Sequence, residues 1–326
     1  MRARRVVMTE VGGPEVLRYE EYEVGEPGPG EALIRQTAVA LNYIDIQHRT
    51  GRYKLPSYPS PIGMEGAGVV EAVGAEVRDI KPGDRVAYSS APIGAYADRR
   101  LMPAHRLVPL PPGITEQQAA ASFTKGLTAH YLIHDTYVVK PGDTILVHAA
   151  AGGVGVLLCQ WAKYVGAHVI GTVGSEEKAA IARAHGCETV INYARENFVE
   201  RVRGLTGGKG VSVVYDSVGK DTFDRSLLCL APEGVLASFG TSSGPVPPLD
   251  VFRLNTLGSL YVTSPAFVTY TTDRAELLQR SAELFSAIAS GMLKLLPIGT
   301  YPLKEAARAH ADLQARRTKG ASVLVP

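Results

Sequence analysis

A glycine turn in the middle of the chain carries the residues best suited to chemistry. The apolar strand segment 143–149 is followed by the run Ala150-Ala151-Gly152-Gly153-Val154-Gly155, which opens an apolar helical segment. Gly152 lets the backbone approach a pyrophosphate, Gly155 lets the helix pack closely on the strand, and the helix N-terminus offers N–H groups to the anion. Ala150 occupies the position of the first glycine in the GxGxxG motif. The turn predicts a dinucleotide site; a tight turn without a ligand is the alternative interpretation.

The end of the next strand indicates which dinucleotide binds. An NAD-specific site needs an acidic residue there to accept from the ribose 2′-OH. The strand 167–173 runs instead into Gly174 and Ser175, which we include among the cofactor contacts, and Lys178 follows in the first helical turn. Its ammonium is placed to bind a 2′-phosphate, so NADPH is the predicted cofactor; a surface lysine is the alternative. The two glutamates beside it are interpreted as solvated first-turn charges that favour the helix dipole.

The elements around this turn alternate between strand and helix. Apolar strands without polar alternation are buried on both faces, so they predict a parallel, doubly wound sheet. The first hundred residues instead give short strands between glycines and prolines, without a helical period sustained for three turns. The closing segments read as helix, strand, helix and strand, and we expect them to return to the first domain. The predicted fold class is α/β: a Rossmann domain over 126–267, inserted in a mostly β domain formed by 1–125 and 268–326.

Composition excludes several classes of protein. Lys+Arg 34 against Asp+Glu 32 gives a net charge of +2, without a basic block, so nucleic acid is not an expected partner. Three separate cysteines cannot form a disulfide framework, which favours a reducing compartment and predicts a cytoplasmic protein. The apolar run near the N-terminus is too short for a signal peptide or an anchor, so no membrane association is expected. Cys159 lies within an apolar helical segment and is expected to be buried.

Many separate segments resemble the medium-chain dehydrogenase/reductase superfamily. Within it they are similar to the quinone oxidoreductase, or zeta-crystallin-like, branch and to the NADPH:quinone oxidoreductases of bacteria. The resemblance covers essentially the whole chain and implies a GroES-like catalytic domain around the Rossmann domain. It also implies NADPH-dependent reduction of quinones by hydride transfer in a cleft between the two domains. The segments are SYPSPIGMEGAGVVEAVGAEVRDIKPGDRVA, HAAAGGVG, INY, VVYDSVG, ASFG and ARRTKGASVLVP.

The sequence departs from the zinc-dependent alcohol dehydrogenases of that superfamily. The positions that resemble their zinc ligands hold Asn42 and Met64, whose amide and thioether replace a thiolate and an imidazole poorly. No cysteine precedes Cys159, so the four-cysteine zinc lobe is missing as well. No metal is predicted, and Asp45 and Glu65 are expected to be hydrogen-bonded structural carboxylates. Without a Lewis acid the acceptor must take hydride unaided, as quinones and activated enones do.

The resemblance and this chemistry together give the candidate site residues. Asn42 and Tyr53 are the candidate catalytic residues, expected to line the substrate pocket and hydrogen-bond the acceptor oxygen, with Asn42 also a cofactor contact. The alternatives are a turn-stabilising amide and a loop aromatic. Arg316 is implied as a second 2′-phosphate ligand reaching from the tail, with a solvated helix-end arginine as its alternative. The other implied cofactor contacts are Thr128, Tyr193, Ser217, Gly219, Phe239, Gly240 and Val262.

Two further functions remain open beside zinc-free quinone reduction. An NADPH-dependent enone or alkenal double-bond reductase would use the same cofactor and pocket. A zeta-crystallin-like binding or structural protein belongs to a different class, and the absence of an Arg-rich segment argues against RNA as its ligand. The apolar segment 259–263 comes late in the sheet order and is expected to pair across the axis of a homodimer.

Overall fold

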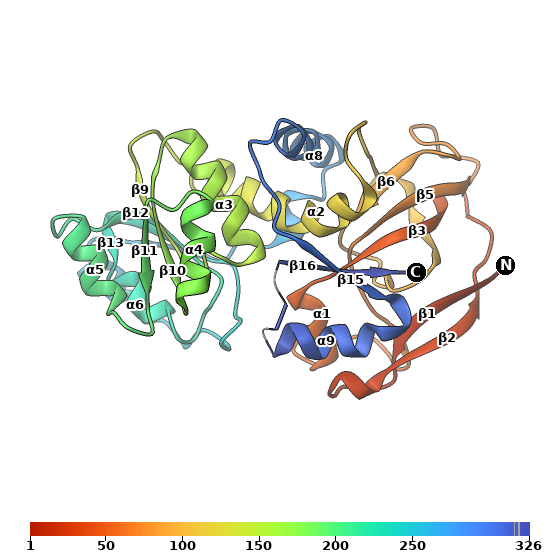
Figure 1. Ribbon diagram of the computed structural model, residues 1–326, viewed down its shortest axis with the longest axis horizontal. Helices are drawn as coiled ribbons and strands as arrows, with labels where there is room; N and C mark the ends of the chain where they lie inside the picture. The colour runs from red at the N-terminus through yellow and green to blue at the C-terminus, as the bar shows by residue number, and fades with distance from the viewer. Residues whose placement is uncertain (316, 319) are drawn as a thin grey trace. The chain divides into compact units, whose positions relative to one another are not determined.

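A computed structural model describes residues 1–315, 317–318 and 320–326 (Figure 1). The chain forms two compact units. Unit 2 interrupts the chain of unit 1, and each unit has a hydrophobic core of its own. Unit 1 consists of Met1–Thr124, Asp273–Ala289 and Leu295–Pro326, and unit 2 of Lys125–Thr272 and Ser290–Lys294.

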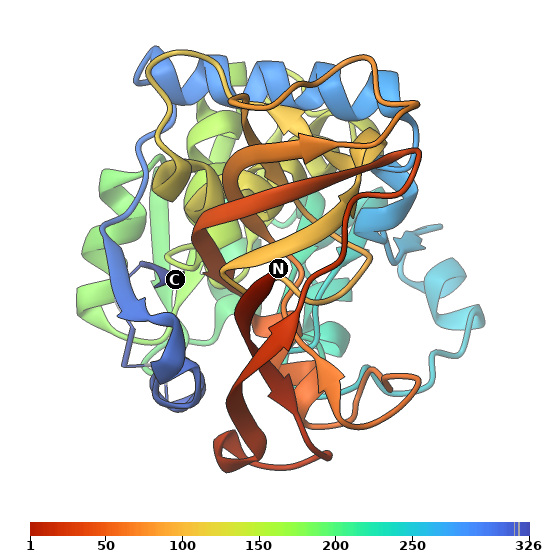
Figure 2. The ribbon, with the colours of Figure 1, turned by 90° about the vertical axis from the view of Figure 1, so that its right-hand side faces the viewer.

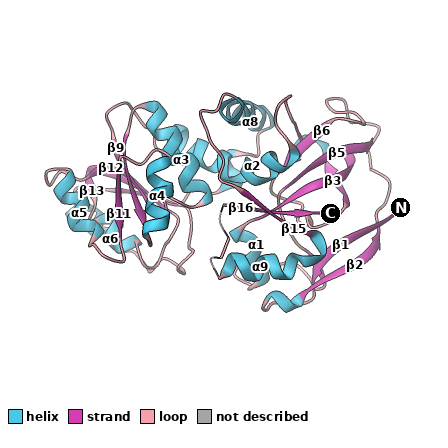
Figure 3. Ribbon diagram, in the orientation of Figure 1, coloured by secondary structure: helices cyan, strands magenta, loops and turns pink. Residues whose placement is uncertain are grey.

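Unit 2 is built on a six-stranded parallel sheet whose central strands are buried along most of their length. Helices α3 and α4 cover one face of this sheet and α5 and α6 the other (Figures 1 and 3). The two halves of the sheet start from the neighbouring central strands β9 and β12. Ligands of such folds bind at the carboxyl ends of these central strands. In sheet order the strands are β11 (Thr189–Asn192), β10 (His168–Val173), β9 (Thr144–Val147), β12 (Val211–Asp216), β13 (Leu230–Ser238) and β14 (Tyr261–Thr263).

Two helix ends of unit 2 lie at residues that are typical of helix caps. Ser175 caps α4 by accepting a hydrogen bond from the Lys178 N–H at 3.3 Å. Gly166 ends α3 in the left-handed conformation, with φ of 100°. The helices are α2 (Glu116–Tyr131), which enters from unit 1, α3 (Gly153–Val165), α4 (Glu176–Ala184), α5 (Phe198–Leu205), α6 (Phe223–Leu227) and α7 (Phe252–Thr256).

Unit 1 consists mainly of antiparallel strands, in a seven-stranded sheet of order β15-β16-β3-β5-β6-β8, with β7 also paired to β3, and a three-stranded sheet of order β2-β1-β4. The C-terminal strand β16 pairs with β3, so the tail returns to the first domain as expected. The strands are β1 (Arg2–Met8), β2 (Leu17–Glu23), β3 (Glu31–Leu41), β4 (Ser60–Pro61), β5 (Gly66–Val73), β6 (Arg85–Tyr88), β7 (Arg99–Pro103), β8 (Val108–Pro109), β15 (Ile298–Pro302) and β16 (Ala321–Val325).

Three helices complete unit 1: α1 (Tyr43–Arg49), α8 (Arg274–Ala289) and α9 (Ala306–Gln314). Figure 2 shows α8, in blue, along the upper side of the strands of this unit. Its Phe285 ring stacks on Phe123 of α2 with 5.6 Å between the ring centroids. None of the described helices is both long and apolar enough to cross a membrane.

All three cysteines are free and lie in the interior of unit 2. The expected burial of Cys159 is confirmed, but this cysteine is not isolated, because its Sγ lies 3.5 Å from the Sγ of Cys187. The contact with Cys187 and burial raise the pKa of Cys159, and burial raises the pKa of Cys229 to about 12. These thiols are therefore protonated at neutral pH.

Candidate active site

The glycine turn joins the carboxyl end of β9 to the start of α3. Gly152 is the N-cap residue of α3, whose first N–H groups have no acceptor within the helix. A Cβ on Gly155 would lie 2.4 Å from the carbonyl oxygen of Ala149, so the helix packs against the strand end as predicted. The N–H of Ala150 donates to the carbonyl of Thr172 at 3.1 Å and ties the turn to β10. The structure therefore places the start of a helix at the carboxyl end of β9, the geometry that anion-binding helix starts have.

Helix α2 passes beside this turn. The side-chain carbons of Lys125 lie against Gly153, where a Cβ would be 2.8 Å from Lys125 Cδ. Thr128 is buried in the next turn of α2. Burial raises the pKa of Tyr131 to about 12, and a hydrogen bond with Thr128 opposes that rise. The helix that carries Thr128 therefore borders the glycine turn.

The carboxyl end of β10 brings four predicted contacts together. Gly174 lies against Tyr193, since a Cβ on Gly174 would be 2.5 Å from the tyrosine hydroxyl. Ser175 caps α4 and Lys178 lies in its first turn. Both Lys178 and Tyr193 are exposed, and no ion pair involves Lys178 in the described part of the chain. An ammonium and an aromatic ring thus flank the position where a strand-end acid is missing.

The carboxylate nearest to this strand end is already engaged. Glu176 accepts a hydrogen bond from Asn192 Nδ2 at 2.8 Å and forms an ion pair with Arg195 at 3.3 Å. The hydrogen bond from Asn192 and the charge of Arg195 lower the pKa of Glu176. Glu176 is an exposed first-turn charge as expected, and its side chain in addition binds Asn192 at the end of β11 and Arg195 beyond it.

A third group of predicted contacts follows β12 and β13. The backbone of Gly240 lies against Ser217, and the Phe239 N–H donates to the carbonyl of Asp216 at 2.9 Å. Val262, on the edge strand β14, is half-buried and pairs in register with Leu236 of β13. The structure thus brings Ser217, Phe239 and Gly240 together, with Val262 on the adjacent strand.

Sequence reasoning missed the residue that organises this loop. The Asp216 carboxylate accepts hydrogen bonds from the N–H groups of Val218 and Gly219 at 2.8 and 3.1 Å and from the Thr222 hydroxyl. Asp216 itself is fully buried. A lone carboxylate at the end of an apolar strand is the signal that would have indicated it, because such a group needs several donors to be buried.

In unit 1, Asn42 is buried at the start of α1. Its Nδ2 donates to Glu65 Oε2 at 2.5 Å, and its N–H donates to Asp45 Oδ2 at 2.8 Å. Glu65 also accepts from the Thr124 N–H at 2.7 Å. The expected hydrogen-bonded role of both carboxylates is confirmed. Tyr53 is exposed, and its ring faces His48 with 5.8 Å between the centroids.

Among the described residues, no group of three or more His, Cys, Asp or Glu side chains is arranged to hold a metal ion. Arg316, the implied second ligand for a 2′-phosphate, lies outside the described residues. Its neighbour Arg317 forms an ion pair with Asp312 at 2.6 Å.

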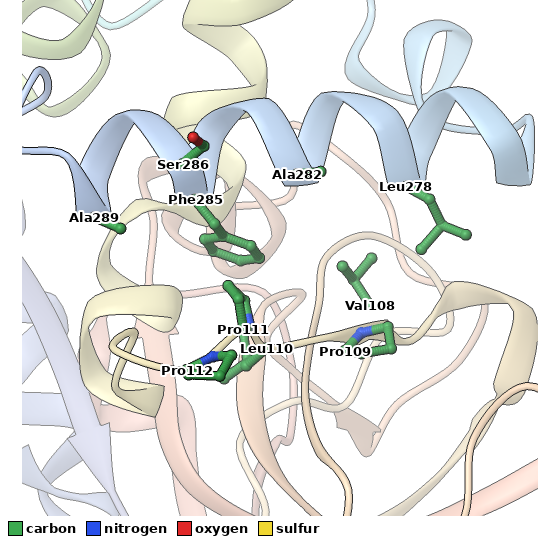
Figure 4. Close-up of a pocket in the computed structure, with 10 residues that line it drawn as sticks. All are labelled: Val108, Pro109, Leu110, Pro111, Pro112, Leu278, Ala282, Phe285, Ser286 and Ala289. Carbon is green, nitrogen blue, oxygen red and sulfur yellow. The ribbon is translucent and has the colours of Figure 1, made fainter.

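A pocket of about 480 Å³ lies in unit 1 between the segment 108–112 and one side of α8 (Figure 4). Its wall is almost entirely apolar, and none of the predicted site residues lines it. The lining residues are Val108, Pro109, Leu110, Pro111, Pro112, Leu278, Ala282, Phe285, Ser286 and Ala289.

Comparison with known proteins matches both units. Residues 28–112 match the alcohol dehydrogenase GroES-like domain, and residues 153–283 match the family described as zinc-binding dehydrogenase. The chain is 50% identical to a quinone oxidoreductase of Pseudomonas aeruginosa, over 99% of this chain and 100% of that protein. It is 45% identical to a 2-haloacrylate reductase of a Burkholderia species, over 98% of each chain.

Among solved structures, that of Escherichia coli quinone oxidoreductase complexed with NADPH is 49% identical, with a TM-score of 0.97. The match covers 99% of this chain and 100% of the Escherichia coli chain. A GroES-like unit with an inserted Rossmann unit defines the medium-chain dehydrogenase/reductase class, so the predicted fold class is confirmed. The chain belongs to the quinone oxidoreductase family of that class, as its motifs indicate.

Proposed function

We propose that this protein catalyses the NADPH-dependent reduction of quinones by hydride transfer. The observation that carries the proposal is the 49% identity, with a TM-score of 0.97, to an Escherichia coli quinone oxidoreductase whose structure is complexed with NADPH. The GroES-like residues 1–125 and 268–326 are assigned the catalytic role, and the Rossmann residues 126–267 the binding of the cofactor.

The turns of unit 2 fit such a cofactor. Because Gly155 brings α3 close to the strand end, the first N–H groups of this helix are presented to a pyrophosphate. Lys178 supplies the positive charge for a 2′-phosphate, with Arg316 as the proposed second ligand. The other proposed contacts are Asn42, Thr128, Ala150, Gly152, Gly153, Val154, Gly174, Ser175, Tyr193, Ser217, Gly219, Phe239, Gly240 and Val262.

NADPH, when bound, supplies the hydride; the protein binds and orients both partners and excludes water. Asn42 and Tyr53 are the proposed contacts of the acceptor oxygen. The hydrogen bond from Asn42 to Glu65 fixes the orientation of the Asn42 amide, and the Thr124 N–H holds Glu65 in turn. With Asn42 and Met64 at the positions of zinc ligands, the proposed acceptor is one that needs no Lewis acid, and solvent supplies the proton.

A second candidate is reduction of an activated carbon–carbon double bond. It is favoured by the 45% identity to a 2-haloacrylate reductase. Steady-state rates with NADPH distinguish the two. We expect kcat/KM for a 1,4-naphthoquinone to exceed that for 2-chloroacrylate or a small enone by about tenfold or more, equivalent to about 1.4 kcal/mol in transition-state stabilisation. A preference for the alkene would assign the protein to the second activity.

We also propose a homodimer formed through the edge of the unit 2 sheet. Strand β14 is an edge strand, and large apolar side chains nearby are exposed: Val251 is 72%, Phe252 68% and Tyr261 61% exposed. Such an edge is a template for pairing with a second copy. A cytoplasmic location is proposed as well, supported by three free cysteines.

Light scattering tests the dimer. The expected mass at micromolar concentration is twice the 34.8 kDa of one chain. Phe252→Asp is expected to shift the population to monomer, because it places a charge in the proposed interface. A wild-type protein that scatters only as a single chain would rule out the dimer.

A further inference from the structure

Four buried polar side chains form a continuous row beneath the turns of unit 2. Thr172 Oγ1 lies 2.8 Å from His148 Nδ1, His148 Nε2 lies 3.0 Å from Ser226 Oγ, and Ser226 Oγ lies 3.0 Å from Asp216 Oδ2. Each of the four is at most 1% exposed. They belong to or directly follow β10, β9 and β12, or lie on α6, so the row crosses the carboxyl ends of three adjacent strands.

The chemistry of the groups gives the row a direction. Ser226 Oγ lies 3.0 Å from Asp216 Oδ2 and 2.9 Å from the carbonyl oxygen of Thr222. Both of these oxygens only accept, so Ser226 donates its one proton to this side of the row. Ser226 must then accept from a proton on His148 Nε2, which leaves His148 Nδ1 to accept from the hydroxyl of Thr172. Burial lowers the pKa of His148, in keeping with a neutral ring. The row is not a nucleophilic triad, because the serine proton points to the oxygens of Asp216 and Thr222 rather than to the histidine.

Three members of the row lie beside different cofactor turns, and Ser226 joins two of them, His148 and Asp216. Asp216 fixes the segment 217–219 by accepting from the N–H groups of Val218 and Gly219. His148 lies two residues before Ala150, where the glycine turn begins, and Thr172 lies two residues before Gly174, at the strand end assigned to the 2′-phosphate. The adenosine, pyrophosphate and nicotinamide contacts are thus linked by one buried hydrogen-bond chain.

We propose that His148 and Ser226 are positioning residues that hold the glycine turn and the 217–219 loop at the separation that NADPH requires. This inference rests on the proposed use of NADPH. Removing the Ser226 hydroxyl leaves the buried His148 donor without its acceptor. The hydrogen bonds then no longer connect the glycine turn to the 217–219 loop. The nicotinamide half of the cofactor then loses affinity, whereas the adenosine half, held by the glycine turn and the end of β10, does not.

Calorimetric titration with NADPH and with 2′,5′-ADP tests this inference, because the fragment lacks the nicotinamide half. Ser226→Ala is expected to raise the Kd of NADPH by about tenfold, the size of one lost buried hydrogen bond, and to leave the Kd of 2′,5′-ADP unchanged. Thr172→Val, which removes only a hydroxyl, is expected to raise both Kd values, and Thr172→Ser to restore both. Equal weakening of both ligands by Ser226→Ala, or no weakening, would overturn the inference.

A measurement on the wild-type protein covers the case in which Ser226→Ala does not fold. Nitrogen-15 NMR of His148 is expected to show a neutral ring with its proton on Nε2 at neutral pH. A proton on Nδ1, or loss of the Thr172→Ser rescue, would contradict the direction of the hydrogen-bond chain.

If the wild-type protein does not bind NADPH at all, the proposed function fails. If it binds NADPH but Ser226→Ala does not discriminate between the two ligands, only the positioning role fails.

Discussion

Replacing Lys178 with alanine is expected to raise the KM for NADPH by about tenfold and to leave the KM for NADH unchanged, because one exposed charge-assisted contact is lost. The reason is that the Lys178 ammonium, in the first turn of α4, is the proposed partner of the 2′-phosphate, which NADH lacks. Glu176, one of the two carboxylates in the same helical turn, is engaged by Asn192 and Arg195. Steady-state kinetics with each cofactor at saturating quinone measure the effect.

Lys163 provides a matched control, since it is an exposed lysine on another helix of the same unit, α3. Lys163→Ala is expected to change neither KM. If Lys178→Ala raised the KM for both cofactors equally, Lys178 would not be a phosphate ligand.

Replacing Gly155 with alanine is expected to weaken NADPH binding by more than about tenfold and to destabilise the protein by about 1–3 kcal/mol, as overpacking at a rigid contact does. The added Cβ would lie 2.4 Å from the Ala149 carbonyl oxygen and 2.9 Å from Ala150 Cα. Both are backbone atoms, so the helix itself must move away from the turn. Calorimetric titration and thermal denaturation record the two effects.

The control is Gly204→Ala in α5, where a new Cβ meets nothing within 4 Å. Alanine has the higher helix propensity, so this variant is expected to keep wild-type affinity and to be as stable or slightly more stable. Wild-type NADPH affinity in Gly155→Ala would mean that the close approach of α3 does not shape the cofactor site.

Much of the fold could be predicted because its signals are local. Glycines and prolines separate the strands of unit 1, so strands such as β3 and β5 stand out as apolar runs between them. In unit 2 the uniform apolar strands and the helix caps at Ser175 and Gly166 indicate a doubly wound sheet. Helix α1 was not predicted, because its seven residues span only two turns and give no sustained period.

The candidate site was predicted from signals of the same local kind. Gly174 directly follows β10, Gly155 lies in the turn after β9, and Lys178 lies in the first turn of α4, so a tight turn or a missing acid can be inferred from residues close in sequence. The hydrogen bond between Asn42 and Glu65 joins residues 23 positions apart, and that between His148 and Ser226 joins residues 78 apart. No local pattern indicates such partners, because only the order of the strands brings them together.

The buried cysteines make the opening of unit 2 measurable by chemical labelling. Only the sequence of unit 2 contains thiols, and the pKa of Cys229 is raised to about 12, so an alkylating reagent reacts only after this unit opens. The labelling rate therefore measures how often the cofactor unit opens, with no signal from unit 1. A ligand that binds the closed form slows that rate, so alkylation reports cofactor binding without any turnover.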